Sequence, residues 1–456
     1  MEDNTKMEKV ISLAKRRGFI YQGSDIYGGL AGTWDYGPLG VALKNIVKNL
    51  WWKKFVLDRE DMYGIDAAIL MNGRVWEASG HVDGFSDPLV EDKKTHKRYR
   101  VDHLLEDNGI SDADKLSLEE MDQVIKEKGI KSPDGNELGT PKNFNMMFQT
   151  RVGASEDSSA VSYLRPETAQ GIFVNFKNII DSFHPKLPFG IAQIGKAFRN
   201  EITPRDFIFR VRELEQMEVE YFIKEVDWEK YFEEWRQVMW QWVDLIGLNK
   251  EKVHELDVAN RAHYSKKTID FEYDYPFGRK ELYGLAYRTD YDLKKHAEYS
   301  KIDLSYLDEA SKEKFVPHVI EPSLGVDRTV LAILDNAYTE DEMGGEKRVF
   351  LKFKPSVAPI KVAVSPLLKN KPELVEKARG VYKELKKEIP EIMWDDNGNI
   401  GKRYRRQDEI GTPFCVTVDF DTLTDDTVTV RDRDTGKQER VKTVDLISRI
   451  KNAILG

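Results

Sequence analysis

Charged side chains recur at every second position within residues 197–222, the stretch AFRNEITPRDFIFRVRELEQMEVEYF. Alternate residues of a β-strand lie on the same face of a sheet. A first strand would therefore present Arg199 and Glu201 on one face, and a second strand would present Arg212, Leu214, Gln216 and Glu218. Arginine forks and fixed carboxylate oxygens suit a bound anion and its hydrogen-bond donors. A solvated sheet face is the alternative interpretation.

Phosphate is an anion that such residues could bind without a glycine-rich loop. The sequence contains no G-x-x-x-x-G-K-[ST] loop, no G-x-G-x-x-G fingerprint and no H-E-x-x-H zinc motif. Arginines would then hold the phosphate, and three of them stand beside acidic residues: Arg199, Arg288 and Arg328. Arg328 would also open a helix, whose N-terminal N–H groups favour an anion. Each arginine alone could instead be a structural ion-pair partner.

Composition excludes several classes of protein. The single cysteine, Cys415, excludes a disulfide within the chain and a cysteine-based zinc site, so no structural zinc is expected. No apolar run approaches the roughly 20 residues of a membrane span, and the charged N-terminus lacks the apolar block of a signal peptide. We therefore expect a soluble, cytoplasmic protein without membrane contact. The net charge of −9 argues against a general polyanion binder, but residues 361–456 hold 19 Lys and Arg against 17 Asp and Glu.

The length of 456 residues predicts at least two domains. Pro355 and Pro359 indicate a boundary, which would separate a first domain at 1–355 from a second at 356–456. The first domain mixes predicted strands and helices, and charged helical stretches indicate insertions near 104–140 and 225–265. The second has the pattern of a small α/β domain.

Several segments resemble motifs of the class II aminoacyl-tRNA synthetases. FRNE followed by VRELEQME resembles motif 2, and EPSLGVDR resembles motif 3. Within this class, other segments are similar to the homodimeric glycyl-tRNA synthetases: SYLRPETAQGIFVNF, YGPLG, SGHVDGFSDPLV and YRRQDEIGTPFCVTVDFDT. The resemblance extends from Tyr21 to the last predicted helix. It implies an α+β fold in which an antiparallel catalytic sheet, flanked by helices, precedes a C-terminal α/β anticodon-binding domain.

The resemblance also implies an activity and a set of ligands. Glycine and ATP would give glycyl-adenylate and pyrophosphate, and the glycyl group would pass to the 3′ end of tRNA(Gly). Mg²⁺ would bridge the phosphates of ATP, and the protein would be a homodimer. The implied catalytic residues are Arg199, Glu201 and Arg328. The implied ATP-binding residues are Arg199, Asn200, Glu201, Phe209, Arg210, Val211, Arg212, Glu213, Leu214, Glu281, Leu282, Gly325, Val326, Asp327 and Arg328.

Glycine recognition would depend on gripping an ammonium group and excluding a Cβ atom. An ammonium has three donors, and the residues implied for glycine include several acceptors. They are Arg100, Glu167, Leu214, Glu215, Gln216, Met217, Glu218, Arg288, Glu321, Pro322, Ser323, Leu324 and Gly325. Exclusion of one methyl group gives about 10- to 200-fold discrimination. The Mg²⁺ ligands are not identified by the sequence, and Glu321 is a candidate.

Two positions depart from the family pattern. Leu214 stands where the family usually has a Phe stacked on adenine, so we expect apolar packing to replace stacking there. Asn72 and Gly73 replace the motif 1 proline, so the dimer is inferred from the other motifs. A basic stretch in the second domain, GKRYRRQDE, matches the position of the family's anticodon-binding domain and implies tRNA contacts for Arg403, Arg405 and Arg406. A solvated helix face is the alternative for this stretch.

Two other functions remain compatible with the residues. A class II synthetase for alanine, serine or threonine would use the same ATP-binding motifs. A non-catalytic tRNA-binding paralogue would keep the fold, but it would not need to retain Arg199, Glu201, Glu321 and Arg328 together. Dependence of ATP–pyrophosphate exchange on glycine separates all three.

Overall fold

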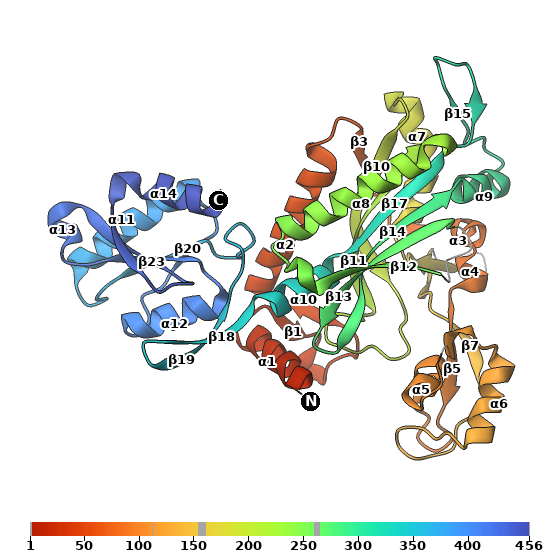
Figure 1. Ribbon diagram of the computed structural model, residues 1–456, viewed down its shortest axis with the longest axis horizontal. Coiled ribbons are helices and arrows are strands. Elements are labelled where there is room, and N and C mark those ends of the chain that lie inside the picture. Colours follow the sequence, from red (N-terminus) through yellow and green to blue (C-terminus); the bar gives the residue numbers. More distant parts are fainter. Residues whose placement is uncertain (1, 112, 154–160, 260–264, 456) are drawn as a thin grey trace.

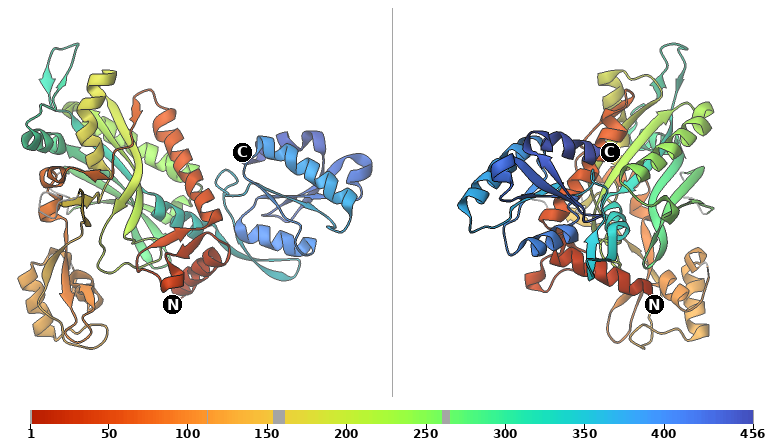
Figure 2. Two further views of the ribbon diagram at one scale, coloured as in Figure 1. Left: turned by 180° about the vertical axis from the view of Figure 1, so that it is seen from behind. Right: turned by 60° about the vertical axis from the view of Figure 1, so that its left-hand side comes forward.

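The computed structural model describes residues 2–111, 113–153, 161–259 and 265–455. Figure 1 shows a large sheet with helices on both faces, a smaller unit formed by the C-terminal residues, and a compact unit around β5 (Ser86–Glu91) and α6 (Leu118–Lys128). Two further views show that the two smaller units lie on different sides of the large sheet (Figure 2).

A seven-stranded sheet forms the centre of the larger part of the molecule. Neighbouring strands are antiparallel except for β3, which runs parallel to β10 at one edge. The order across the sheet is β12 (Val253–Asp257), β13 (Lys267–Tyr275), β14 (Gly278–Thr289), β17 (His318–Gly325), β11 (Glu213–Ile223), β10 (Phe189–Phe198) and β3 (Met62–Gly64). The predicted antiparallel, helix-flanked sheet is therefore confirmed.

Different helices cover the two faces of this sheet. On one face, which we call the core face, Met217, Val219 and Tyr221 of β11 pack with apolar side chains of α1 (Glu2–Arg16), α2 (Pro38–Trp52), α8 (Trp228–Leu245) and α10 (Val326–Ala337). The other face is the open face. There, α7 (Ala169–Phe183) and α9 (Tyr291–Ser300) pack with Phe189 and Phe222 at one end. The remainder of the open face carries the polar side chains of the site.

Short elements surround the main sheet. α3 (Gly73–Ala78) contacts α9, and α4 (His81–Gly84) follows it directly. The small sheets are β1 (Ile20–Gln22) with β2 (Trp34–Tyr36), β15 (Tyr306–Leu307) with β16 (Lys314–Phe315), β18 (Tyr338–Met343) with β19 (Glu346–Leu351), and β4 (Leu70–Met71) with β9 (Val161–Leu164) and β8 (Gln149–Arg151).

The compact unit spans residues 86–145 and has its own apolar cluster. Its three strands are β5, β6 (Arg98–Arg100) and β7 (Lys142–Asn145), and its two α-helices are α5 (Val101–Asp107) and α6. The cluster includes Val90, Val101, Leu104, Leu105, Met121 and Ile125. The helical insertion predicted near 104–140 is thus part of a larger unit with strands of its own. The sequence did not indicate this unit, because a strand pattern alone does not tell which sheet a strand joins.

The second helical insertion, predicted near 225–265, differs from the structure. α8 packs Trp235, Met239 and Trp242 into the core-face cluster. After α8 the chain returns as β12, the edge strand of the main sheet. This segment therefore completes the main sheet, and the helical prediction was wrong for β12. Residues 260–264 of the predicted range lie outside the described residues.

The C-terminal unit is a five-stranded sheet with helices, as the sequence predicts. The order is β21 (Ile392–Trp394), β20 (Val362–Pro366), β22 (Phe414–Val418), β23 (Thr427–Asp432) and β24 (Gln438–Lys442), of which the first three are mutually parallel. Its helices are α11 (Pro372–Glu388), α12 (Ile400–Ile410), α13 (Thr422–Asp425) and α14 (Thr443–Leu455). Cys415 is buried on β22. Arg348 of β19 joins this unit to the preceding hairpin through ion pairs with Asp341 and Asp408.

Candidate functional site

The connection between β10 and β11 carries Arg199, Arg210 and Arg212, three of the four arginines implied for ATP. β10 ends at Phe198 and β11 begins at Glu213, so Arg199, Glu201 and Arg212 lie beyond the strands on which the alternation places them. The backbone N–H of Arg199 donates to the carbonyl of Arg212 at 2.9 Å, which closes the base of the connection. The strand prediction was too long by several residues because proline and aspartate turn residues lie between the two arginines.

A pocket of about 320 Å³ opens at this end of the open face. It is bounded by the connection, the start of β11, β14 and the junction between β17 and α10. Its lining contains residues implied for ATP and for glycine: Arg100, Arg199, Glu201, Phe209, Arg210, Val211, Leu214, Glu215, Gln216, Glu281, Leu282, Ser323, Gly325, Asp327 and Arg328. Met146 and Ile208, which the sequence did not indicate, complete the lining. The motif 2 and motif 3 segments therefore meet in one place. We call this the arginine pocket.

Arg328 is held in the arginine pocket by Glu281 and Phe209. Its Nη1 lies 3.1 Å from Glu281 Oε2 and donates to the Glu281 carbonyl at 3.0 Å. Its guanidinium lies over the Phe209 ring, 4.4 Å from the centroid. The charge of Arg328 holds the pKa of the Glu281 carboxyl below its ordinary value, although burial opposes this shift. The pair therefore stays ionised, and the guanidinium forms a flat positive wall.

Other charged groups of the pocket keep hydrogen-bonding capacity for a ligand. Arg199 Nε donates to the Pro166 carbonyl at 3.0 Å. Glu201 Oε2 and Arg210 Nη1 are 4.0 Å apart, and neither forms a hydrogen bond with the described residues. Buried polar atoms are usually hydrogen-bonded, so these two atoms indicate a place where a ligand or water completes the site.

The compact unit contributes one arginine to the pocket. Arg100, at the end of β6, pairs with Asp87 at 2.6 Å and with Asp102. Asp87 belongs to β5, so the position of Arg100 is fixed from within the unit.

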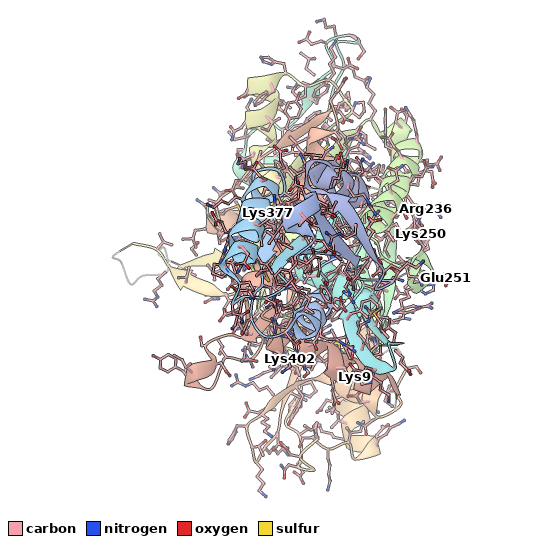
Figure 3. The ribbon with its side chains drawn as sticks, turned by 90° about the vertical axis from the view of Figure 1, so that its left-hand side faces the viewer. Lys9, Arg236, Lys250, Glu251, Lys377 and Lys402 are labelled. Carbon is pink, nitrogen blue, oxygen red and sulfur yellow. The ribbon has the colours of Figure 1, made fainter. Side chains whose placement is uncertain are left out.

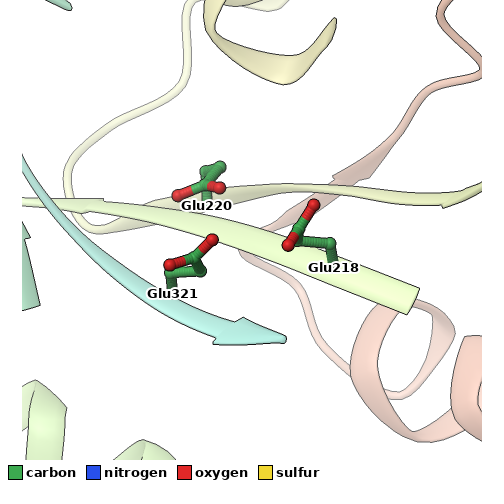
Figure 4. A group of neighbouring side chains, drawn as sticks. All are labelled: Glu218, Glu220 and Glu321. Carbon is green, nitrogen blue, oxygen red and sulfur yellow. The ribbon is translucent and has the colours of Figure 1, made fainter. Parts of the chain in front are cut away.

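The next part of the open face is acidic. Glu218 and Glu220 of β11 and Glu321 of β17 face one another in Figure 4, with one oxygen of each lying within 4.8 Å of the others. Glu218 accepts hydrogen bonds from Ser323 at 2.7 Å and from Thr168. Glu220 is fully buried, and neither of its oxygens has a hydrogen-bond partner among the described residues. We call these three residues, with Glu167, the acidic pocket, and the name denotes this cluster of carboxyl groups.

Arg288 is the buried cation of the acidic pocket. Its Nη1 donates to Glu321 at 2.8 Å, and two of its other nitrogens donate to Asp292 at 2.9 Å each. Arg288 lies at an irregularity in the pairing of β14 with β17, between Tyr287 and Thr289. Such a bulge redirects a side chain, and the alternation of a strand gives no sign of it.

Negative charge exceeds positive charge in the acidic pocket, and the carboxyl pKa values reflect this. Burial raises the pKa of Glu321 to about 8 against the opposing effect of Arg288. Burial and the nearby Glu321 raise the pKa of Glu220 well above its ordinary value. Burial and Glu167 also raise the pKa of Glu218. Burial and mutual repulsion therefore favour the protonated form of these three carboxyl groups, and a cationic ligand would favour the ionised form.

Glu167 behaves differently from the other three carboxyls. Burial alone would raise its pKa, but His81 and Arg288 hold the pKa below the ordinary value. His81 Nε2 lies 3.4 Å from Glu167 Oε2, and Gln170 Nε2 donates to the other oxygen at 2.9 Å. Glu167 is therefore an ionised carboxylate whose present partners could be joined or replaced by an ammonium group.

Comparison with known proteins identifies the family. The family model described as the tRNA synthetase class II core domain (G, H, P, S and T) matches residues 151–337, and the anticodon binding domain matches residues 361–453. A protein of Clostridium acetobutylicum named glycine–tRNA ligase is 54% identical over 98% of each chain. Proteins of the same name from Caldanaerobacter subterraneus subsp. tengcongensis (95% of each chain) and Lachnospira eligens (96% of this chain and 97% of the relative) are each 52% identical. The chain belongs to the glycine–tRNA ligase family.

Membership of this family confirms the resemblance seen in the sequence. The structure separates the implied site residues into those that reach the two pockets and those that do not. Met217, Leu324 and Val326 are buried in the core-face cluster. Pro322 is buried on β17 opposite Leu285, and Asn200 is held by a backbone bond to Met146. Glu213 pairs with Lys196, and Arg212 donates to the carbonyls of Glu201 and Ala31.

Glu215 and Asp327 line the arginine pocket, but their carboxylates turn to the core face. There they pair with Lys44 at 2.9 Å and 3.4 Å. The neighbours in sequence, Leu214 and Arg328, remain in the pocket. Leu214 also packs against the core-face cluster, and its packing against adenine in place of the family's Phe stays a prediction.

Sequence reasoning missed several side chains that complete the acidic pocket. His81, Thr168, Gln170 and Asp292 each contact a carboxylate or Arg288. Thr168 and Gln170 lie one and three residues after Glu167 in the segment PETAQG, and His81 lies in SGHVDGF, both segments that resemble the family. The place of these three residues in the motif segments therefore indicates a role in the site, which their charge alone does not indicate.

The basic stretch implied for tRNA lies on α12, and its members differ in exposure. Arg403 is only 2% exposed and donates to the carbonyls of Pro366, Asp396 and Gly398. Arg405 and Arg406 are partly exposed and pair with Glu346 and Asp395. The structure thus gives Arg403 a structural role, which differs from the implied tRNA contact, because Arg403 lies on the side of α12 that packs against the rest of the C-terminal unit.

Within the described residues, none of the helices is long and apolar enough to cross a membrane.

Proposed function

We propose that the protein is a glycine–tRNA ligase that forms glycyl-adenylate at the two adjoining pockets of the open face. The single observation that supports this most strongly is the position of the acidic pocket beside the arginine pocket. Family membership supports the same assignment. A polyanion and a small ammonium compound could bind next to each other there, and a substrate without a side chain needs no further space.

ATP would occupy the arginine pocket. Arg199 and Arg210 would contact its phosphates, and Arg328 would lie against adenine or the terminal phosphate. Leu214 and Phe209 would supply apolar surface for the base. Gly284 of β14 supports this placement. A Cβ atom built there meets nothing within 4 Å, so the surface of the sheet at this position is free for a ligand.

Glycine would bind with its ammonium in the acidic pocket. Glu167, Glu218, Glu321 and Ser323 would supply the acceptors, and Arg288 would keep Glu321 in place. The carboxylate of glycine would then point towards the α-phosphate of ATP. A substrate with a Cβ atom would have to displace packed side chains, which costs about 1 to 3 kcal/mol per methyl group.

The chemistry requires positioning and charge stabilisation rather than a nucleophile from the protein. A glycine carboxylate oxygen attacks the α-phosphorus, the bond to the pyrophosphate oxygen breaks, and pyrophosphate leaves. Arg199 would stabilise the negative charge on the α-phosphate, and the two pockets would align the reactants. A ribose hydroxyl at the 3′ end of tRNA(Gly) then attacks the glycyl carbonyl, and AMP leaves.

Mg²⁺ would enter with ATP and supply positive charge to the phosphates. Hard cations prefer carboxylate oxygens, and Glu201 Oε2 has no hydrogen bond to the described residues. Glu201 and Glu281 line the arginine pocket and fit this requirement. Glu321 fits less well than Glu201, because one of its oxygens accepts from Arg288, and Glu281 is likewise paired with Arg328.

Further proposals concern the partners and the division of the chain. We place adenylation in residues 1–355 and anticodon recognition in residues 356–456, with Arg405 and Arg406 on the tRNA side. Lys377 and Lys402, labelled in Figure 3, lie on the side of the C-terminal unit that faces the viewer and would add to a basic tRNA surface. A cytoplasmic homodimer follows from the resemblance to the homodimeric type.

ATP–pyrophosphate exchange measured with each amino acid in turn tests the proposed function. We expect exchange with glycine and little with any other amino acid. Exchange that depends on alanine, serine or threonine instead would indicate a class II synthetase for that amino acid. Binding of tRNA without exchange for any amino acid would indicate a non-catalytic paralogue.

A further inference from the structure

A cluster of charged side chains lies behind the arginine pocket, on the core face of the sheet. It comprises Tyr36 of β2, Lys44 and Lys48 of α2, Glu215 of β11 and Asp327 of α10. The resemblance to the family assigns no role to Tyr36, Lys44 or Lys48. Lys44 is 5% exposed, and Asp327 is 6% exposed. Charged groups are rarely buried unless they are paired, so this cluster requires an explanation.

Each carboxylate oxygen of the cluster has a partner. Glu215 Oε2 lies 2.9 Å from Lys44 Nζ, and Glu215 Oε1 lies 3.1 Å from Lys48 Nζ. Asp327 Oδ1 accepts from the Tyr36 hydroxyl at 2.6 Å and lies 3.4 Å from Lys44 Nζ. Asp327 Oδ2 accepts from the backbone N–H of Glu215 at 2.8 Å. Two cations therefore balance two anions, and Asp327 joins α10 directly to the backbone of β11.

The cluster contacts the two segments that form the adenine end of the pocket. Glu215 follows Leu214 on β11, and Asp327 precedes Arg328 in the first turn of α10. Neighbouring residues of a strand point to opposite faces, so fixing Glu215 on the core face fixes Leu214 on the open face. The start of α10 is fixed relative to β11 because Asp327 accepts from the backbone N–H of Glu215. The spacing between Leu214 and Arg328 therefore depends on the bonds between Glu215 and Asp327.

Lys44 is the central member of the cluster. Burial disfavours its charge, but Asp327 and Glu215 overcome this and raise the pKa of the Lys44 ammonium above its ordinary value. The ammonium also lies 4.3 Å from the centroid of the Tyr36 ring. Apolar residues of similar volume often stabilise a core as well as a buried ion pair does. A directional ionic cluster at this point therefore contributes more to the relative position of β11 and α10 than to the stability of the fold.

We propose that Lys44, Tyr36, Glu215 and Asp327 form a positioning cluster that sets the distance between Leu214 and Arg328 and thereby shapes the ATP subsite. The inference rests on the proposed placement of ATP. It assigns no contact with ATP to Lys44 or Tyr36, which act through Leu214 and Arg328. A cluster with only a structural role would affect stability and would not distinguish ATP from glycine.

The test compares Lys44→Met, Lys44→Arg and Tyr36→Phe with the matched control Lys53→Met. Lys53 follows α2 and forms an exposed ion pair with Asp58. Steady-state exchange gives kcat and the KM values for ATP and glycine, and circular dichroism follows folding. We expect Lys44→Met to raise the KM for ATP about tenfold, below the roughly 100-fold cost of a 1 Å misplacement, with the KM for glycine within about twofold of the parent protein. Lys44→Arg should restore part of this loss, and Lys53→Met should behave as the parent.

Tyr36→Phe keeps the inference testable if Lys44→Met does not fold. This variant removes one hydrogen bond to Asp327 and no charge, and it should raise the KM for ATP by about two- to fivefold, the effect of a bond worth about 0.5 to 1 kcal/mol. Folded variants with unchanged KM values, or with equal increases for ATP and glycine, would overturn the inference. Arg328→Ala measured in parallel tests the underlying ATP site. If it leaves the KM for ATP unchanged, the placement of ATP fails as well.

Discussion

The arginine pocket and the acidic pocket share one face of one sheet, yet they are prepared for ligands in opposite ways. In the arginine pocket, Glu201 and Arg210 retain buried polar atoms without hydrogen bonds to the described residues. In the acidic pocket, Glu167, Glu218 and Glu321 already have partners, which are His81, Ser323 and Arg288, while Glu220 has no hydrogen bond to the described residues. A large polyanion brings its own acceptors, whereas a small ammonium must compete with groups that are already in place. We therefore expect the arginine pocket to determine mainly the rate of adenylate formation and the acidic pocket to determine mainly the selectivity for glycine.

The largest effect is expected for Arg199→Ala, which removes a charge from the arginine pocket. We expect ATP–pyrophosphate exchange to fall by about 100- to 1,000-fold, the usual effect of losing one group that stabilises transition-state charge. Circular dichroism should show a folded protein, because Arg199 Nε has only one backbone acceptor among the described residues. Arg98→Ala is a suitable control, since that arginine is exposed on the compact unit. Normal exchange by folded Arg199→Ala would refute the assignment of the arginine pocket.

Glu167→Ala removes the ionised carboxylate of the acidic pocket. The KM for glycine should rise by about 10- to 100-fold, because a buried ammonium short of one acceptor costs about 1 to 3 kcal/mol. The KM for ATP should change little. Exchange kinetics measured against both substrates provide the check, and Glu309→Ala provides a control at an exposed carboxylate. Equal losses for glycine and ATP would mean that Glu167 is a structural residue.

A smaller effect is expected in the C-terminal unit, where two arginines remain candidates for tRNA contacts. Arg405→Ala with Arg406→Ala should weaken tRNA charging several-fold and leave glycine-dependent exchange intact. If each arginine contacts one phosphate, the slope of log affinity against log salt should fall by up to about 2. Arg403→Ala is the contrasting variant: it should lower the thermal midpoint, because Arg403 is buried and binds backbone carbonyls. Unchanged charging by the folded double variant would place the tRNA contact elsewhere.

The sequence predicts the polar face of β11 and the position of Arg328 at a helix start, because both follow from local spacing. Arg288 enters its pocket through an irregularity in strand pairing, which local spacing does not show. Glu215 and Asp327 carry the same charge as the carboxylates of the open face, but Lys44, which is distant in sequence, pairs with both of them on the core face. Burial of Arg403 likewise depends on carbonyls of other segments. The sequence thus indicates which residues could do chemistry, and partners remote in sequence decide which of them do.

The excess negative charge of the acidic pocket leads to a prediction about stability rather than about rate. Burial, Glu321 and Glu218 raise the pKa of Glu220 well above its value in the unfolded chain, although Arg288 opposes the shift. Between these two pKa values, the folded protein binds one more proton than the unfolded chain. Stability should therefore fall as the pH rises above about 4.5, by up to about 1.4 kcal/mol per pH unit for one proton.

Glu220→Gln removes this titration while preserving the shape of the side chain. The amide N–H groups could donate to Glu321 or Glu218, so the variant should fold and retain most of its exchange activity. Thermal midpoints at pH 6, 7, 8 and 9 should decrease less steeply for Glu220→Gln than for the parent, and the variant should be the more stable protein at pH 8. Glu229→Gln, at an exposed position of α8, should follow the parent curve. If Glu220→Gln also follows the parent curve, Glu220 is ionised in the folded protein, and the acidic pocket holds its charge without a proton at this position.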